Sequence, residues 1–257
     1  MILDEIVEMR KKRITLAKEF VSIENLKMQI KHCRPTRNFA DALKQTGMQY
    51  ICEVKKASPS KGDIVSVFDP VAIAKSYEAA GASAISVLTE PDFFKGDNKY
   101  LSAIAAAVAI PIIRKDFIID AYQIYEARVI GADAILLICA ILSEEQLIIF
   151  LKLAESLGLA VLVEAHDAKQ IAMAVAAGAS IIGVNNRDLR TFIVDLQNSI
   201  ALRKQVPATL TFVAESGIKT REDIILLEQA GVDCVLIGET LMRSTDKKAL
   251  LTYLKGE

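Results

Sequence analysis

Seven apolar runs along the chain each end at a charged or polar residue. They read YICEVK, SVLTE, IIRKD, AVLVE, IIGVNNR, TFVAES and VLIGE. Runs of this kind are typical of strands that are buried on both faces of a parallel sheet. Stretches with helical spacing separate them, so the chain alternates strand and helix. Because parallel strands end at the same edge, we expect their terminal polar residues to carry the function.

The alternation predicts eight strand–helix units. Strands are expected near 50–54, 84–88, 111–114, 134–138, 159–163, 180–184, 210–214 and 234–238. Helices are expected at 70–80, 99–108, 120–130, 144–157, 168–177, 196–205, 220–230 and 246–254. Residues suited to helix N-caps precede four of these helices, namely Asp120, Ser143, Asp167 and Thr220. Eight units are the number that closes an α/β barrel.

A weak internal repeat supports this fold. The segments EAAGASAISVL, RVIGADAILLI, VAAGASIIGVN and EQAGVDCVLIG each place a glycine between a helix end and a strand. Glycine is favoured just after a helix, where the backbone adopts positive φ. The glycines in question are Gly81, Gly131, Gly178 and Gly231. We therefore predict an α/β fold, a (β/α)8 TIM barrel.

The first part of the chain lies outside the barrel pattern. Apolar residues recur there at helical spacing above a charged face, at Leu3, Ile6, Val7, Ile14 and Ala17, and a second short helix is expected from Asn38 to Thr46. We predict a single domain over 1–257, with an N-terminal helical extension at 1–48 and the barrel at 49–257. The extension either covers the barrel floor or faces the substrate.

Composition excludes several classes of partner. Lys and Arg (31) balance Asp and Glu (32), and no basic stripe is interleaved with aromatic residues, so we expect neither a nucleic-acid nor a membrane partner. Apolar stretches such as 103–113 are shorter than the ~18 residues of a membrane span, and no secretory leader is recognisable. We expect a cytoplasmic protein. The widely spaced cysteines predict free buried thiols and no metal site.

Two pairs of opposite charges mark the expected barrel mouth. Glu53 and Lys55 share one face at the end of the first strand. Lys115 and Glu164 end the third and fifth strands with inward parity, so both overhang one cavity in a closed barrel. A Lys and a Glu that face one substrate form an acid/base pair, and we expect burial to bring their pKa values toward neutrality.

Later strand ends carry groups that suit an anionic substrate. Asn185 and Arg187 share a face, and Arg187 suits either an anion or an ion pair at the rim. Glycine-containing loops follow the seventh and eighth strands, where α/β barrels often bind phosphate; they contain Glu215, Ser216, Gly217, Gly238 and Glu239. The hydroxyl groups of the bent Ser58-Pro59-Ser60 loop are a further candidate for phosphate.

Three phenylalanines and one histidine are the remaining candidates for the site. Phe93, Phe94 and Phe117, near two strand ends, can form the wall of a site for an aromatic substrate or pack in the core. His166 has no second histidine nearby in the sequence, so we expect it to be structural or solvated. No metal is expected.

The ordered motifs EVKKASPSKG, VLTEPDFFKG, IIRKDFIID, LVEAH, IGVNNRDL, AESGI and IGETLMR resemble those of the indole-3-glycerol-phosphate synthase family. The resemblance runs from the N-terminal segment to the last helix. It implies ring closure, decarboxylation and dehydration of 1-(2-carboxyphenylamino)-1-deoxyribulose 5-phosphate to indole-3-glycerol phosphate, without a cofactor. It also implies a carboxy-lyase of tryptophan biosynthesis.

The resemblance assigns roles residue by residue. It implies that Lys115 is the general acid, and that Glu164 is the general base or stabilises a cationic intermediate. Glu53, Lys55 and Asn185 join the catalytic set, with Lys55 near the substrate carboxylate. The implied substrate-binding residues are Arg187, Glu215, Ser216, Pro59, Phe94 and Phe117. The implied phosphate site is Ser58, Gly217, Gly238 and Glu239, with the Glu239 carboxylate turned away.

Three alternatives remain at this point. Another phosphosugar barrel enzyme has similar requirements, either a phosphoribosylanthranilate isomerase or a Schiff-base aldolase that uses Lys55 or Lys115 as a nucleophile. A barrel that binds a phosphorylated metabolite without turning it over is the third. The sequence does not determine the oligomeric state, and a monomer is the working expectation.

Overall fold

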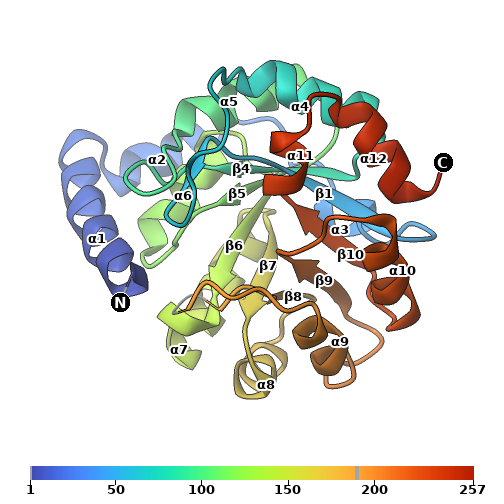
Figure 1. Cartoon of the computed structure of the whole chain (residues 1–257). Coiled ribbons are helices and arrows are strands. Elements are labelled where there is room, and N and C mark those ends of the chain that lie inside the picture. Colours follow the sequence, from blue (N-terminus) through green and yellow to red (C-terminus); the bar gives the residue numbers. More distant parts are fainter. Residues whose placement is uncertain (1, 189–190) are drawn as a thin grey trace.

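The computed structural model describes residues 2–188 and 191–257. In this part of the chain eight parallel strands close into a barrel in the order β1-β10-β9-β8-β7-β6-β5-β4 (Figure 1). The strands are β1 (Gln49–Val54), β4 (Ala84–Leu88), β5 (Ile112–Lys115), β6 (Ala134–Ile138), β7 (Ala160–Ala165), β8 (Ile181–Asn185), β9 (Thr211–Glu215) and β10 (Cys234–Ile237). The predicted (β/α)8 barrel is confirmed. Leu189, which ends the IGVNNRDL motif, lies outside the described residues.

Helices surround the barrel and follow the strands as predicted. They are α4 (Pro70–Ala79), α5 (Asn98–Ala107), α6 (Ala121–Val129), α7 (Glu144–Ser156), α8 (Ala168–Ala176), α9 (Gln197–Arg203), α10 (Arg221–Gln229) and α12 (Lys247–Lys255). The four predicted N-caps accept hydrogen bonds from backbone N–H groups of the first helical turn. Among the described residues, no helix combines the length and apolar character needed to cross a membrane.

The repeated glycines adopt the predicted conformation. Gly81, Gly131, Gly178 and Gly231 have φ values of 78°, 96°, 89° and 80°. Each ends a helix and turns the chain into the next strand. Glycine has no Cβ, so this left-handed conformation costs it little. The internal repeat therefore reflects one turn geometry used four times.

Alternating side chains divide the core into two layers. Ile51, Ile113, Leu162 and Ile181 point into the barrel, whereas their sequence neighbours pack between strands and helices. The short helix α3 (Phe39–Ala42) places Phe39 in the inner cluster, together with Leu43, which follows the helix. This part of the extension closes the barrel floor, as one of the two alternatives predicted.

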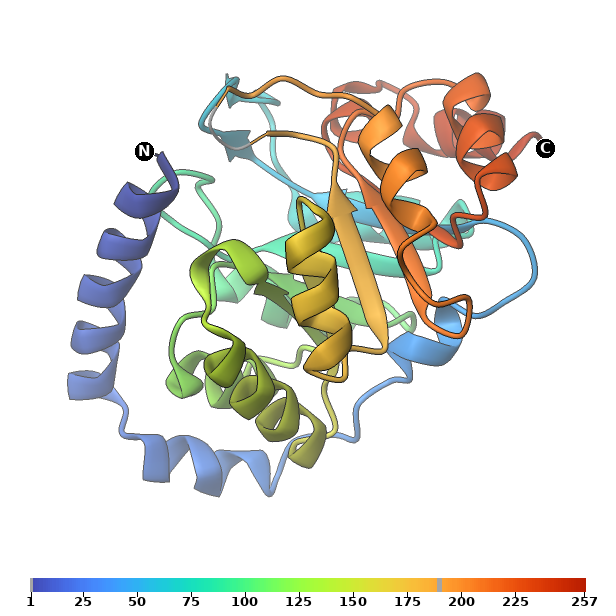
Figure 2. The ribbon, with the colours of Figure 1, turned by 90° about the horizontal axis from the view of Figure 1, so that it is seen from below.

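The first helix of the extension lies near the barrel mouth, which corresponds to the other predicted role, that of facing the substrate. Helix α1 (Ile2–Phe20) lies outside the barrel, and α2 (Ile23–Ile30), which the sequence reasoning missed, packs against α6 (Figure 2). The first turns of α1 bring Ile2, Leu3 and Ile6 to the barrel mouth. The extension therefore contacts both ends of the barrel.

Buried ion pairs attach the extension to the barrel. Arg10 of α1 donates to the buried carboxylate of Asp116, 3.1 Å away, directly after β5. Near the floor, Arg34 and Arg37 bind the carboxylate of Asp133 at 2.7 and 3.3 Å. A buried carboxylate needs such partners, because its desolvation is otherwise unfavourable. Asp133 also accepts the backbone N–H of Ile112, so it links the extension to β5.

Candidate active site

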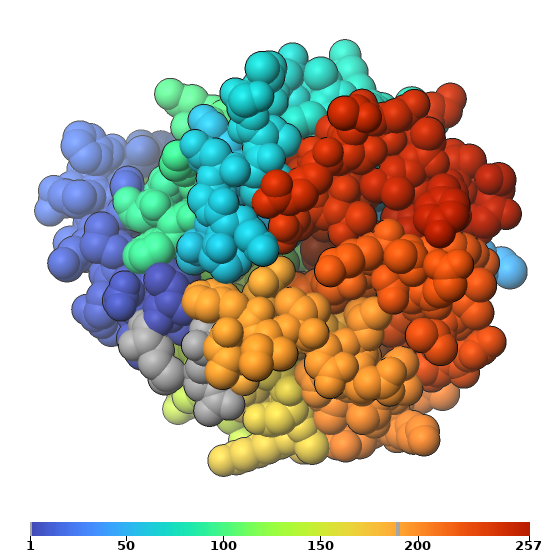
Figure 3. All heavy atoms as spheres, in the orientation of Figure 1, coloured from blue at the N-terminus to red at the C-terminus, as the bar shows by residue number. Residues whose placement is uncertain are grey.

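A cavity of about 610 Å³ opens at the carboxyl ends of the strands (Figure 3). This volume suits a substrate of the size of a small organic phosphate. Every residue that the resemblance placed in the site lines it: Glu53, Lys55, Ser58, Pro59, Phe94, Lys115, Phe117, Glu164, Asn185, Arg187, Glu215, Ser216, Gly217, Gly238 and Glu239. Phe93 is not among the lining residues. The structure thus brings together groups that come from distant parts of the chain.

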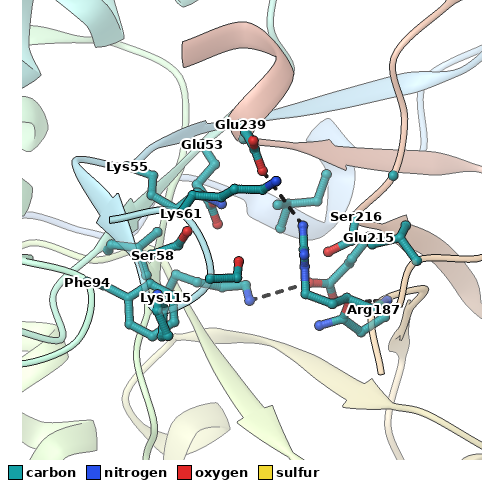
Figure 4. Close-up of a pocket in the computed structure, with 18 of the residues that line it drawn as sticks. Glu53, Lys55, Ser58, Lys61, Phe94, Lys115, Arg187, Glu215, Ser216 and Glu239 are labelled. Atoms are coloured by element: carbon teal, nitrogen blue, oxygen red, sulfur yellow. Dashed lines mark hydrogen bonds and ion pairs between the residues drawn. The ribbon is translucent and has the colours of Figure 1, made fainter. Parts of the chain in front are cut away.

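Lys115 lies between two carboxylates in the depth of this cavity (Figure 4). Its Nζ is 3.3 Å from Oε2 of Glu164 and 3.4 Å from Oε2 of Glu215. The three residues lie on β5, β7 and β9, and both glutamates are almost fully buried. An ammonium group is therefore fixed against two carboxylates at the base of the mouth.

The charge balance in the cavity contradicts the expectation that Lys115 and Glu164 both titrate near neutrality. Burial lowers the pKa of Lys115, but the carboxylates of Glu164, Glu215 and Glu53 outweigh it, so the pKa is raised. Burial raises the pKa of Glu164, but Lys115 outweighs it, and the pKa is lowered. The pair is therefore held ionised, because each charge stabilises the other.

Glu215, rather than Lys115 or Glu164, has a pKa that is shifted toward neutral pH. Burial raises its pKa to about 8, and the negative charges of Glu164 and Glu53 add to this effect, while Lys115 opposes it. One ammonium group cannot hold both of its neighbouring carboxylates ionised at low cost. The sequence named Glu215 as a lining residue and missed that it is the carboxyl group poised near neutral pH.

A second charge pair lies on β1 and in the loop that follows it. Oε1 of Glu53 is 2.7 Å from Nζ of Lys55, and both side chains point into the mouth, as the strand alternation predicted. Gly238 lies against them: a Cβ at this position would be 2.9 Å from the Lys55 nitrogen and closer still to the Glu53 carboxylate. The absent side chain of Gly238 therefore gives this pair its room.

The loop after β1 and two aromatic rings form one wall. The strands β2 (Ala57–Ser58) and β3 (Gly62–Asp63) make a small hairpin whose tip carries Pro59, Ser60 and Lys61 into the cavity lining. The rings of Phe94 and Phe117 lie 5.9 Å apart, centroid to centroid. Lys61 was not named from the sequence, although its place beside the Ser-Pro-Ser turn could have indicated it.

The loops after β8, β9 and β10 form the opposite rim. The side chain of Asn185 accepts the backbone N–H of Arg187 at 3.0 Å. Ser216 and Gly217 both have positive φ, 68° and 89°. The hydroxyl of Thr240 donates to the carbonyl of Ile218 at 2.7 Å and so joins the last two loops. A short helix, α11 (Glu239–Arg243), begins directly after Gly238.

The carboxylate of Glu239 differs from its prediction. It does not turn away from the cavity but lies at its rim, 2.9 Å from Nε of Arg243 and 3.8 Å from Nη2 of Arg187. Burial raises its pKa, but Arg243 and the nearby Lys61 and Lys55 outweigh this, so the pKa is lowered. The rim thus combines several cations with one anion.

His166 contacts the site, which the sequence reasoning did not foresee. Its Nε2 lies 3.5 Å from Oε1 of Glu164, and its backbone N–H donates to Oε1 of Gln170. The signal was its position two residues after Glu164, on the same face of the strand end. Within the ranges 2–188 and 191–257, no group of three His, Cys, Asp or Glu side chains is arranged to hold a metal ion.

Known proteins resemble this chain over its whole length. A family model described as indole-3-glycerol phosphate synthase matches residues 3–254. The protein of that name from Ruminiclostridium cellulolyticum is 52% identical, and the match covers 100% of this chain and 99% of the relative. The one from Endomicrobium trichonymphae is 53% identical, with coverage of 99% and 100%.

Solved structures resemble the chain in fold alone. A 3-hexulose-6-phosphate synthase from Salmonella typhimurium superimposes with a TM-score of 0.67 over 81% of this chain and 97% of that one, at 14% identity. A thiamine phosphate pyrophosphorylase from Pyrococcus furiosus gives 0.61 over 81% and 94%, also at 14%. Both likenesses support the barrel and carry no argument about chemistry.

Proposed function

The chain belongs to the indole-3-glycerol phosphate synthase family, and we propose that its barrel mouth converts 1-(2-carboxyphenylamino)-1-deoxyribulose 5-phosphate into indole-3-glycerol phosphate. This carboxy-lyase reaction of tryptophan biosynthesis closes a ring and releases carbon dioxide and water. One observation supports it most: Lys115 lies between Glu164 and Glu215 in a cavity with glycine loops at its rim.

The substrate phosphate binds at the rim. Ser58 offers a hydroxyl group there, and Gly217 and Gly238 expose bare backbone that a phosphate can approach closely. The backbone N–H of Glu239 adds a donor at the start of α11, while its carboxylate stays with Arg243. Arg187 and Ser216 complete this part of the pocket.

The remaining groups orient the aromatic half of the substrate. Its carboxylate lies near Lys55, and its ring lies against Pro59, Phe94 and Phe117, which line the same wall. Holding the ring against the sugar carbonyl turns a slow encounter into an intramolecular reaction. The proposed chemistry therefore needs positioning and proton transfer, both of which side chains of the cavity supply.

Lys115 is the general acid of ring closure. As the ring carbon attacks the carbonyl carbon, the ammonium group donates a proton to the carbonyl oxygen, which becomes a hydroxyl group. The raised pKa of Lys115 keeps this proton in place until the attack begins. Transfer is then favourable, because the developing alkoxide is a stronger base than an amine.

Proton donation by Lys115 also changes the basicity of Glu164. While Lys115 is charged, it holds the pKa of Glu164 low, and the carboxylate stabilises the cationic intermediate formed by ring attack. Once Lys115 has given up its proton, that restraint is gone and Glu164 becomes a stronger base. Asn185, which hydrogen-bonds to Glu164, keeps it oriented, and Glu53 with Lys55 serves the later proton transfers.

The charge state of Lys115 argues against the aldolase alternative. A Schiff-base lysine needs a neutral amine, whereas the two carboxylates around Lys115 favour its ammonium form. Borohydride reduction in the presence of substrate tests this directly. A covalent adduct at Lys115 contradicts the general-acid assignment.

The decisive assay adds the carboxyphenylamino sugar phosphate to the purified protein and follows indole fluorescence. We expect turnover without any added cofactor, and no conversion of phosphoribosylanthranilate. Absence of an indole product would refute the proposed function.

We further propose that residues 1–257 act as one domain and as a monomer in the cytoplasm. The buried Arg10–Asp116 and Arg34–Asp133 pairs support the union of extension and barrel. Sedimentation velocity tests the oligomeric state; a dimer at micromolar concentration would contradict it.

A further inference from the structure

The inward face of β8 has a gap at Gly183. Ile181 and Asn185 on the same face point side chains into the barrel, and Gly183 lies between them. In the strand register Gly183 is opposite Glu164 on β7, and Asn185 is opposite Glu215 on β9. The gap is therefore enclosed by residues of the proposed site.

The carboxyl group of Glu215 fills this gap. A Cβ added to Gly183 would collide with Oε1 of Glu215 and would come within 3.1 Å of Cδ1 of Leu162. Oε1 is also completely buried and has no hydrogen-bond partner among the described residues. Its other oxygen, Oε2, contacts Lys115 at 3.4 Å.

We propose that Gly183 is a positioning residue: its missing side chain provides the seat that holds the Glu215 carboxyl group deep in the barrel, in contact with Lys115. This inference rests on the proposed function and deepens it. Alanine would move the carboxyl group toward the mouth by about 1 Å, the distance needed to reach an ordinary van der Waals contact. Displacements of that size at a reacting centre cost up to about a hundredfold in rate.

The seat also controls the charge of Glu215. The charged groups that face Glu215 are Lys115 from β5, Glu164 from β7 and Glu53 from β1. Glu53 is paired with Lys55, whereas Glu215 shares the single ammonium group of Lys115 with Glu164. Burial then favours its neutral form, with a pKa of about 8. A neutral carboxyl group here can donate a proton to the hydroxyl group that leaves as water.

The test compares kcat/KM across pH for wild type and Gly183→Ala, because this ratio reports ionisations of the free enzyme. For the wild type we expect a limb near pH 8, that is, a change of slope where kcat/KM is plotted against pH. We expect Glu215→Gln to abolish this limb. In Gly183→Ala the limb moves to lower pH, since Glu215 becomes better solvated, and kcat/KM falls at least about tenfold. An unchanged pH profile, with kcat/KM within about twofold, would overturn the inference.

Two further variants separate positioning from stability. Gly178→Ala adds the same methyl group just before β8, at a φ of 89° and with no atom within 4 Å, so it strains the backbone without touching the cavity. It should keep the wild-type limb. Glu215→Asp shortens the acid so that it no longer fills the seat, and it should shift the limb even if Gly183→Ala does not fold.

A double-mutant comparison completes the test. If Gly183 acts through the space it leaves for Glu215, Gly183→Ala should cost little extra in the Glu215→Asp background. Additive losses would overturn the inference, as would equal losses with unchanged profiles in Gly183→Ala and Gly178→Ala. Lack of indole formation by the wild type would refute the proposed function and this inference with it. Wild-type turnover with an unaltered Gly183→Ala profile refutes the inference alone.

Discussion

Replacing Lys115 by methionine removes the central charge of the cavity and keeps most of the side-chain volume. The expected loss in kcat is about two to four orders of magnitude, because a positioned general acid contributes about that much. Substrate should still bind, since the phosphate and ring contacts are made by other residues. KM is therefore expected to change much less than kcat.

The structure also indicates how much Lys115→Met lowers the free energy of unfolding. At separations of 3.3 and 3.4 Å, each attraction between Lys115 and a carboxylate amounts to about 5 kcal/mol at an effective dielectric constant of about 20. Desolvation of the three groups offsets most of this. Removing one partner of a buried pair leaves the other uncompensated, so we expect the free energy of unfolding to fall by about 3–5 kcal/mol near pH 8.

The pH dependence of this loss has a definite sign. Without the ammonium group, the effect of burial loses its largest opponent, and we expect the pKa of Glu164 to rise above its unfolded value of 4.5 although His166 and Asn185 still lower it. The folded variant then binds more protons than the unfolded chain, so its stability decreases as pH rises from that value. The difference between variant and wild type should be small near pH 5 and largest near pH 8.

Indole fluorescence measures turnover, and urea unfolding at pH 5 and pH 8 measures stability. Lys152→Met, an exposed position on α7, is the matched control and should change neither. A Lys115→Met variant that turns over within tenfold of the wild type would refute the general-acid role. Equal stability losses at both pH values would refute the electrostatic argument.

Three further predictions concern other parts of the chain. Asp133→Asn should lower the free energy of unfolding by about 2–4 kcal/mol in urea titrations, because Arg34 and Arg37 lose a buried anion; an unchanged midpoint contradicts this. A thiol reagent at pH 8 should label Cys33 in the folded protein but the buried Cys52, Cys139 and Cys234 only after unfolding; rapid labelling of all four is the opposing result. Glu239→Gln should lower KM, since it removes a negative charge from the proposed phosphate rim, and a higher KM would mean that Glu239 is needed to hold Arg187 and Arg243.

Local pattern was sufficient for the barrel. Alternation of period two gave the inward parity of the strand ends, and Ile51, Ile113 and Leu162, which share that parity, lie inside the barrel. The N-caps and the helix-ending glycines depend on a few adjacent residues and were found for that reason. Helix α2 was missed because its short apolar stripe lies among charged residues.

The sequence also predicted which residues form the site. Glu53, Lys115, Glu164 and Glu215 each lie at the end of a strand with inward parity, and a closed barrel brings such residues to one mouth. His166 and Lys61 lie within two of the quoted motifs, LVEAH and EVKKASPSKG, but were not selected as site residues. Neighbourhood in the sequence could have indicated both.

The sequence by itself determined which side chains reach the mouth, because strand parity and turn chemistry are local properties of the chain. Only the tertiary structure decided how those side chains share their charges. Lys115 and Glu164 are 49 positions apart, yet their atoms lie 3.3 Å from each other with Glu215 alongside. The resulting proton distribution depends on burial and on distances across the barrel, and neither quantity is contained in any short segment.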